Sequence, residues 1–212
     1  MTQVWGPMGW ITLHSISANY PETASNEDKM ILKKFLDLFA ETISCPNCKS
    51  HFSTMFRSYT NQNPTWADGR YNFFLFVVRA HNTVNKRLDK PRPGTVLECI
   101  ESLKMLTKNK AASQFRNSYI NYLLSNWARE GGGEGMIQMG NVREMRKIND
   151  QYWNLREISF DSLSFQEADI LTPIATSPRM LSPYSQTPVY SAPSGPAFGF
   201  KLTGGKFSFG KR

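Results

Sequence analysis

The sequence predicts an all-α protein, and three observations support that fold class. Apolar residues recur at helical spacing in successive segments of residues 5–128. No segment of useful length alternates apolar and polar residues as a half-buried strand does. Stretches rich in proline, glycine and polar residues separate the periodic segments, as loops between helices do. A bundle of helices is the architecture that these features favour.

Two helices are predicted before the first cysteine. The first covers residues 5–19, and Tyr20-Pro21 ends it. The second begins at Ser25, which forms a capping-box-like pair with Asp28 three residues later, and continues to about Ile43. The faces of these helices are Trp10, Leu13, His14 and Ser17 in the first, and Ile31, Phe35, Leu38 and Phe39 in the second.

A third helix should begin at Cys45-Pro46-Asn47-Cys48, because a proline in the first turn of a helix loses no hydrogen bond. A loop with Pro64 and Gly69 follows it, and a fourth helix then extends to about Leu88. The inward face of the fourth helix starts apolar and turns polar without changing sides. The inward residues are Cys48, Phe52, Met55, Phe56 and Tyr59 in the third helix, and Tyr71, Phe74, Leu75, Val78, His81, Asn82, Asn85 and Leu88 in the fourth.

The remaining chain predicts further helices and then a tail. A fifth helix covers Thr95 to about Lys108, and another covers residues 112–128. Glycines at 131–135 indicate a hinge before a weakly patterned helix at 141–158. From about residue 172 the serine, proline and glycine content is too high to bury much apolar surface, which predicts disorder. We expect three units: a domain of residues 1–110, a helical extension of 111–160 and a low-complexity, disordered tail of 161–212.

Charge and cysteine content narrow the function classes. The formal charge is +8, but the basic residues form no compact block, so nucleic-acid binding is unsupported. The chain shows neither a secretory signal pattern nor an apolar run long enough to span a membrane, and we expect it in the cytoplasm. Three cysteines argue against a secreted disulfide framework and favour one catalytic or metal-binding pair plus a spare thiol.

The Cys45-x-x-Cys48 motif suits thiol–disulfide exchange. A helix N-terminus stabilises the negative charge of a thiolate, which is the attacking species in that exchange. Two alternatives remain open. Cys45, Cys48, His51 and Cys99 form a possible zinc set, although zinc ligands normally come as two closely spaced pairs. A thioredoxin-like site would need a βαβ context, which this helical pattern lacks.

Four polar residues fall on the inward faces of two predicted helices: His14, His81, Asn82 and Asn85. A lone histidine on an apolar face is usually a core residue, but each buried polar group needs a partner. A bound polar cofactor would supply these partners. Its flat ring could stack between Trp10 and a histidine, and Lys86 or Lys90 could meet phosphates.

These motifs resemble the Erv/ALR family of FAD-dependent sulfhydryl oxidases over about residues 4–110. The resemblance rests on Trp5-Gly6, Trp10-x-x-Leu13-His14, Tyr20-Pro21, Cys45-x-x-Cys48 and His81-Asn82-x-Val84-Asn85-x-x-Leu88-x-Lys90-Pro91. It implies a four-helix bundle with a short fifth helix, holding FAD at its mouth and usually forming a homodimer. Cys48 would lie against the flavin, and Cys45 would exchange with the substrate. The implied cofactor contacts are Gly6, Trp10, His14, His81, Asn82, Val84, Asn85, Lys86 and Lys90.

The resemblance also implies a reaction and partners. Electrons would pass from a dithiol protein, or from a thioredoxin-like relay protein, through the CxxC pair to FAD and then to molecular oxygen, which releases hydrogen peroxide. No resident metal is expected.

Three departures from the family pattern are visible. Pro7 replaces a common arginine, Val78 stands where a structural cysteine is usual, and no second shuttle cysteine pair exists. Such cysteine-poor versions are similar to those of large cytoplasmic DNA viruses, where the oxidase is a late protein that serves virion disulfides in the host cytoplasm. The rival hypothesis is a non-catalytic virion or scaffold protein that retains the oxidase fold.

Overall fold

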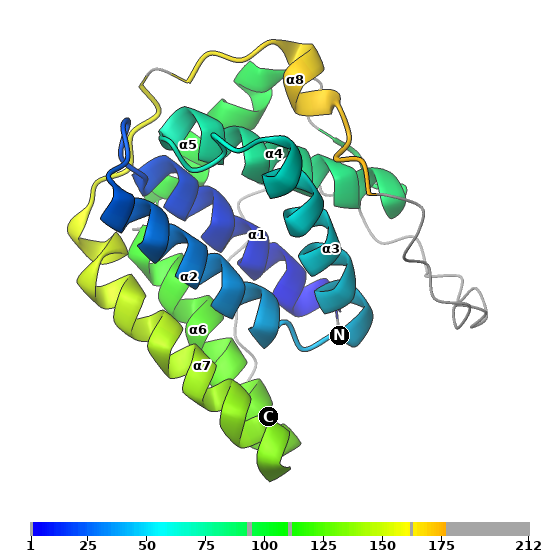
Figure 1. Ribbon diagram of the computed structural model, residues 1–212, viewed down its shortest axis with the longest axis vertical. Coiled ribbons are helices and arrows are strands. Elements are labelled where there is room, and N and C mark those ends of the chain that lie inside the picture. The colour runs from blue at the N-terminus through cyan, green and yellow to red at the C-terminus, as the bar shows by residue number, and fades with distance from the viewer. Residues whose placement is uncertain (1, 93–94, 110–111, 162, 177–212) are drawn as a thin grey trace.

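A computed structural model describes residues 2–92, 95–109, 112–161 and 163–176, and these contain helices and no strand (Figure 1). The all-α prediction is therefore confirmed. Four helices form the bundle, and four more follow in the chain together with a 3-10 turn, Trp153–Leu155. The helices are α1 Thr2–Asn19, α2 Asn26–Thr42, α3 Pro46–Gln62, α4 Arg70–Arg87, α5 Val96–Asn109, α6 Ala112–Glu130, α7 Gly132–Gln151 and α8 Glu167–Leu171.

Local chemistry sets the helix ends that the sequence predicted. Ser25 and Asp28 form a complete capping box at α2, each side chain accepting a hydrogen bond from the other residue's backbone N–H. Pro46 occupies the first turn of α3 behind the N-cap residue Cys45. Gly69 precedes α4 because a Cβ there would lie 2.0 Å from the carbonyl oxygen of Glu22. Only glycine allows that approach of the two loops.

Helix α4 is buried on two sides, which corrects its predicted single inward face. Phe73 and Phe76 enter the main core of the bundle, although the sequence pattern did not select them. Phe74 and Val78, which it did select, pack in a second cluster with residues of α5 and α8, including Cys99. Periodicity identifies one face of a helix, and here α5 and α8 cover a second one.

Helices α6 and α7 extend the bundle. α6 packs along α1 and α7 packs along α2, and the two helices also pack against each other (Figure 1). The indole N–H of Trp127 donates a 3.0 Å hydrogen bond to the carbonyl of Thr42, and Tyr119 and Val142 belong to the same core cluster as Phe39. The predicted extension therefore shares one hydrophobic core with the predicted domain. The functional division at residues 110 and 160 stays a prediction.

The hinge between α6 and α7 is shorter than predicted. Gly131 and Gly132 have positive φ angles of 64° and 62°, a backbone conformation that glycine adopts easily. Gly133 and Gly135 are already helical, since α7 covers Gly132–Gln151 and not 141–158. A Cβ on Gly135 would lie 2.8 Å from the carbonyl oxygen of Trp127, so the glycines allow the two helices to meet closely.

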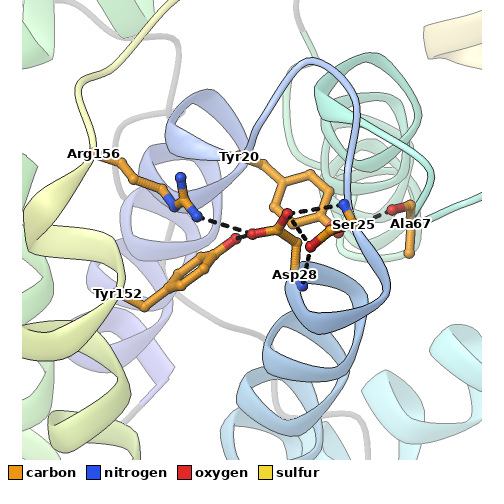
Figure 2. A network of polar contacts seen from close by, with 6 residues as sticks. All are labelled: Tyr20, Ser25, Asp28, Ala67, Tyr152 and Arg156. Carbon is orange, nitrogen blue, oxygen red and sulfur yellow. Dashed lines mark hydrogen bonds and ion pairs between the residues drawn. The ribbon is translucent and has the colours of Figure 1, made fainter.

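A polar network anchors the chain beyond α7 (Figure 2). Tyr152 donates a 2.5 Å hydrogen bond to Oδ1 of Asp28, and Arg156 forms a 2.9 Å ion pair with the same oxygen. Burial opposes ionisation of Asp28, but the hydrogen bonds from Tyr152 and Ser25 and the charge of Arg156 outweigh it and lower the pKa of this carboxyl. The network joins the start of α2 to the end of the helical extension.

Residues 163–176 cross the outer side of α4, with Leu163, Ile170 and Ile174 buried. The backbone N–H of Ile174 donates a 2.9 Å hydrogen bond to Oγ1 of Thr83, and Arg79 donates to the carbonyl of Thr172. Residues 163–176 are thus packed chain, which corrects the disorder predicted for this part of the tail. Residues 177–212, to which that prediction also applies, lie outside the described residues. Within the described part of the chain, no helix is long and apolar enough to cross a membrane.

Candidate functional site

Cys45 and Cys48 form a disulfide at the N-terminus of α3, with their Cα atoms 5.2 Å apart. The backbone N–H of Cys48 donates a 3.3 Å hydrogen bond to Sγ of Cys45, so this sulfur acts as the helix N-cap. Both cysteines are half-buried against the main core, whereas Pro46 and Asn47 between them are exposed. The pair is therefore supported from inside and accessible from outside, as a disulfide that exchanges with another dithiol must be.

Trp10, His14 and His81 lie together between α1 and α4. The rings of Trp10 and His81 stack, with centroids 4.4 Å apart and planes 11° from parallel. His14 Nε2 and His81 Nδ1 are 3.0 Å apart and share a hydrogen bond. We expected a cofactor ring between Trp10 and a histidine, but a ring inserted between Trp10 and His81 would need a centroid separation of about 7 Å. In this arrangement such a ring can stack only on an outer face.

Burial keeps the two histidines neutral. It lowers the pKa of His14 to about 4. The pKa of His81 is well below the usual value, because of burial first and then the charges of His14 and Lys90. A neutral imidazole has one donor and one acceptor nitrogen, so one ring donates to the other. Nδ1 of His14 is then left buried without a partner among the described residues.

The two predicted asparagines already hold backbone groups. Asn82 donates a 2.9 Å hydrogen bond to the carbonyl of Ile170 in α8, and Asn85 donates a 3.3 Å hydrogen bond to the carbonyl of Pro91. Asn82 therefore fixes the segment that crosses α4, a role that the sequence pattern did not suggest. Asn85 shapes the turn after α4, where the backbone N–H of Lys90 also donates to its carbonyl at 2.8 Å.

The other predicted cofactor residues differ in exposure. Val84 is half-buried and packs on the main core. Lys86 and Lys90 are exposed at the end of α4, where their charges could face phosphates. A Cβ on Gly6 would meet nothing within 4 Å, so no neighbour in this structure requires glycine there. The cofactor contacts proposed for these four residues remain predictions.

Unpartnered buried atoms test whether a polar cofactor fits this region. Nε1 of Trp5 and Nδ1 of His14 are both buried and have no hydrogen-bond partner among the described residues. Both residues are on α1, but only His14 belongs to the cluster with Trp10 and His81, because the Trp5 ring lies on the opposite side of the helix, near Phe39 and Tyr119. Unsatisfied buried polar atoms are uncommon in folded proteins. A flavin dinucleotide, which presents ring nitrogens, carbonyls, hydroxyls and phosphates, fits this donor set.

Two residues near the cysteines were not predicted to act together. Arg87 Nη1 lies 2.5 Å from His51 Nδ1, and His51 is one turn beyond Cys48 on α3. Burial, followed by the charge of Arg87, lowers the pKa of His51. Both side chains are exposed, and hydrophobic periodicity gives no signal for such a pair.

The third cysteine lies apart from this pair. Cys99 is buried in the second cluster beside Phe74 and Val78, and burial raises the pKa of its thiol to about 12. Within the described residues, no group of three or more His, Cys, Asp or Glu side chains could hold a metal ion. The geometry therefore gives no support to the set of Cys45, Cys48, His51 and Cys99.

Comparisons with known proteins place these motifs in a family. The Erv1/Alr family pattern matches residues 7–111. The chain is 32% identical over 87 residues to the mitochondrial FAD-linked sulfhydryl oxidase ERV1 of Saccharomyces cerevisiae, a match covering 41% of the chain and 44% of that protein. An Arabidopsis thaliana FAD-linked sulfhydryl oxidase is 32% identical over 85 residues, or 40% of this chain and 42% of that protein.

The match covers a larger share of the length of a viral relative. The FAD-linked sulfhydryl oxidase of African swine fever virus is 31% identical over 86 residues, which are 41% of this chain and 69% of the viral protein. The chain thus spans less than half of the length of the yeast and plant relatives but more than two thirds of this one. Since the family pattern matches residues 7–111 and the chain covers 69% of a viral FAD-linked sulfhydryl oxidase at 31% identity, the chain belongs to the Erv1/Alr family.

Proposed function

We propose that this protein is a FAD-linked sulfhydryl oxidase that makes disulfide bonds in dithiol protein substrates. The observation that carries the proposal is the Cys45–Cys48 disulfide at the N-terminus of α3. The relatives named as FAD-linked sulfhydryl oxidases support it. The overall reaction converts one substrate dithiol and one oxygen molecule into one substrate disulfide and one hydrogen peroxide.

The first chemical step is thiol–disulfide exchange at the cysteine pair. A substrate thiolate attacks Sγ of Cys45, which forms a mixed disulfide and releases Cys48 as a thiolate. The second substrate thiol then attacks the mixed disulfide, leaving the substrate oxidised and Cys45 reduced. The free N–H groups at the start of α3 stabilise the negative charge on these sulfurs, as the bond from Cys48 N–H to Cys45 Sγ illustrates.

When bound, FAD would supply the two-electron redox chemistry that links the reduced cysteine pair to oxygen. The residues that would hold it are Gly6, Trp10, His14, His81, Asn82, Val84, Asn85, Lys86 and Lys90. Neutral His14 and His81 would offer hydrogen bonds without adding charge. Trp10 would offer an aromatic face, and the lysines at the end of α4 would meet the phosphates.

Oxygen consumption with dithiothreitol tests the proposal. The wild-type protein should consume oxygen and release peroxide in equal amounts. Cys48→Ser should abolish turnover and keep bound flavin, because it removes the sulfur that would pass electrons to the flavin. Cys99→Ala is the matched control, since it also removes one thiol but leaves the pair intact, and it should keep turnover. Wild-type turnover in Cys48→Ser would disprove the proposed electron path.

The non-catalytic scaffold is the second candidate, and the extra helices favour it most. α6 and α7 cover α1 and α2 and add surface that a minimal bundle would not need. A yellow, folded protein without thiol turnover would support that candidate. The buried, unpartnered Nδ1 of His14 argues against it, because a scaffold gains nothing from this atom.

The proposal also concerns the oligomeric state of the protein and its location. The sides of α1 and α2 that α6 and α7 cover are not available to a second copy, so a homodimer would have to use other faces. Light scattering on the purified chain measures whether a dimer forms. Residence in the host cytoplasm or in a virion, and expression late in an infection, are parts of the proposal that rest on the viral relative.

A further inference from the structure

A cavity of about 430 Å³ lies away from the cysteine pair, at the end of α1. Asn19, which lines it, is two and a half turns beyond Trp10, or about 13 Å along the helix axis. The first turn of α6 and residues 154–160 complete the wall. A cavity of this size is within the range that holds small-molecule ligands.

Arg116 of α6 lines this cavity, and its side chain is only 2% exposed. Its guanidinium donates four hydrogen bonds, and every acceptor is a neutral group. These bonds join Nε to Asn149 Oδ1 at 2.7 Å, Nη1 to Asn19 Oδ1 at 2.8 Å and to Ser15 Oγ at 3.3 Å, and Nη2 to Asn154 Oδ1 at 2.9 Å. A guanidinium has five N–H groups, so one on Nη2 remains for another acceptor.

No carboxylate in the described part of the chain forms an ion pair with Arg116. Asp150, an exposed acid, joins this network indirectly, because its Oδ1 accepts 3.1 Å hydrogen bonds from the amides of Asn149 and Asn154. A buried charge usually has a charged partner, because removing it from water is costly. Burial lowers the pKa of Arg116 only to about 10, so the group still carries its charge at neutral pH.

The remaining wall is mostly positive. Lys104 and Arg156 line the cavity, against the single acid Glu157. Arg156 is already paired with Asp28, as Figure 2 shows, and the ammonium of Lys104 lies 5.8 Å from the ring centroid of Phe160. The first turn of α6 faces the cavity and contains no acidic residue, so its N–H groups add positive potential.

We propose that this cavity binds the phosphate group of a small molecule, with Arg116 as the charged contact at its base. The planar guanidinium and the N–H groups of a helix N-terminus both match phosphate oxygens. Phe160 and Ile158, which also line the cavity, provide apolar surface for the rest of such a molecule. The cavity lies outside the cysteine and histidine clusters, so this binding does not depend on the oxidase activity.

Isothermal titration of the full chain, kept saturated with FAD, tests the inference. The probes are inorganic phosphate, uridine 5′-monophosphate and uridine, and uracil avoids competition with adenine for a flavin site. Both phosphate-containing probes should bind at one site, with an affinity that falls as salt rises, and uridine should not bind. Tighter binding of the nucleotide would identify a phosphate ester as the ligand, whereas equal binding would identify free phosphate.

Variants connect binding to the cavity. Lys104→Gln should weaken phosphate binding about fivefold, the effect of one exposed charge contact. Lys147→Gln on α7 changes the net charge equally and should leave binding unchanged. Ser113→Trp, which fills the cavity, should abolish binding, and Ser118→Trp on the same helix should preserve it. Arg116→Lys should bind at least tenfold more weakly where circular dichroism shows native helix content.

Three outcomes would overturn the inference. One is no saturable binding of either phosphate probe. Another is equal weakening by Lys104→Gln and Lys147→Gln, which would indicate a general charge effect. The third is unchanged binding in Ser113→Trp, because the ligand would then lie elsewhere.

Discussion

Replacing His14 with glutamine should make the protein less sensitive to mild acid. His14 is buried, and burial lowers its pKa to about 4 from an ordinary value of 6.5. Between these two values the unfolded chain binds a proton at this histidine and the folded chain does not. Stability therefore falls as pH drops below 6.5 and stops falling near pH 4. Glutamine has no proton to bind, so this loss disappears.

The size of the effect follows from the two pKa values. At about pH 5.5 the unfolded histidine is roughly 90% protonated and the folded one is almost fully neutral, which costs about 1.4 kcal/mol relative to pH 8. For a domain of this size, that corresponds to a decrease in Tm of about 3 to 5 °C. His81 adds a loss in the same direction, because its pKa is also well below the ordinary value.

Thermal unfolding of the full chain by circular dichroism, at one fixed excess of FAD, measures this effect. The quantity compared is the decrease in Tm from about pH 8 to about pH 5.5, which should be smaller in His14→Gln by about 3 to 5 °C. His51→Gln is the matched control, and it should keep most of the decrease because this histidine is exposed. An unchanged decrease in His14→Gln, or an equal reduction in His51→Gln, would refute the assignment of a neutral buried His14.

Three further predictions concern the fold and the site. Trp153→Ala should lower the free energy of unfolding by about 3–5 kcal/mol in a denaturant titration, because this fully buried ring packs on Tyr20 and Phe35. A loss below about 1 kcal/mol would mean that the helical extension does not share the core of the bundle. Asp28→Asn should destabilise the protein at neutral pH and reduce its loss of stability below about pH 4, because the contacts that lower the pKa of Asp28 stabilise only its ionised form. A variant with the same acid profile as the wild type would contradict the network in Figure 2. Cys45→Ser should abolish dithiothreitol oxidation, whereas persistent oxidation would mean that substrates attack Cys48.

Much of the bundle could be predicted from local signals. The Ser25 capping box and Pro46 in the first turn of α3 act within a few residues, so sequence alone revealed both helix starts. The buried face of α3 was also confirmed, because one side of this helix meets the core and the other meets solvent. The CxxC motif and the inward-facing His14 and His81 were also visible in the sequence, before any family resemblance was considered.

The rest depends on contacts between distant parts of the chain. Asn82 donates a hydrogen bond to the carbonyl of Ile170, a contact that no local pattern specifies, and its contact with a cofactor stays a prediction. Arg116 was not selected, because an arginine in a helical pattern is normally exposed and its acceptors come from α1 and α7. Residues 163–176 lack a strong pattern of their own, and they pack because α4 has a second apolar side.

A visible absorption spectrum of the purified full chain tests whether electrons pass from the cysteine pair to a bound flavin and then to oxygen. The spectrum is recorded in air, after dithiothreitol is added without air, and again after air returns. We expect the bands of oxidised flavin, their bleaching by dithiothreitol through the Cys45–Cys48 pair, and their recovery with oxygen. The same bleaching should not occur at this rate in Cys48→Ser. A protein that is colourless as purified, and still colourless after incubation with FAD and removal of the unbound FAD, would contradict this electron path.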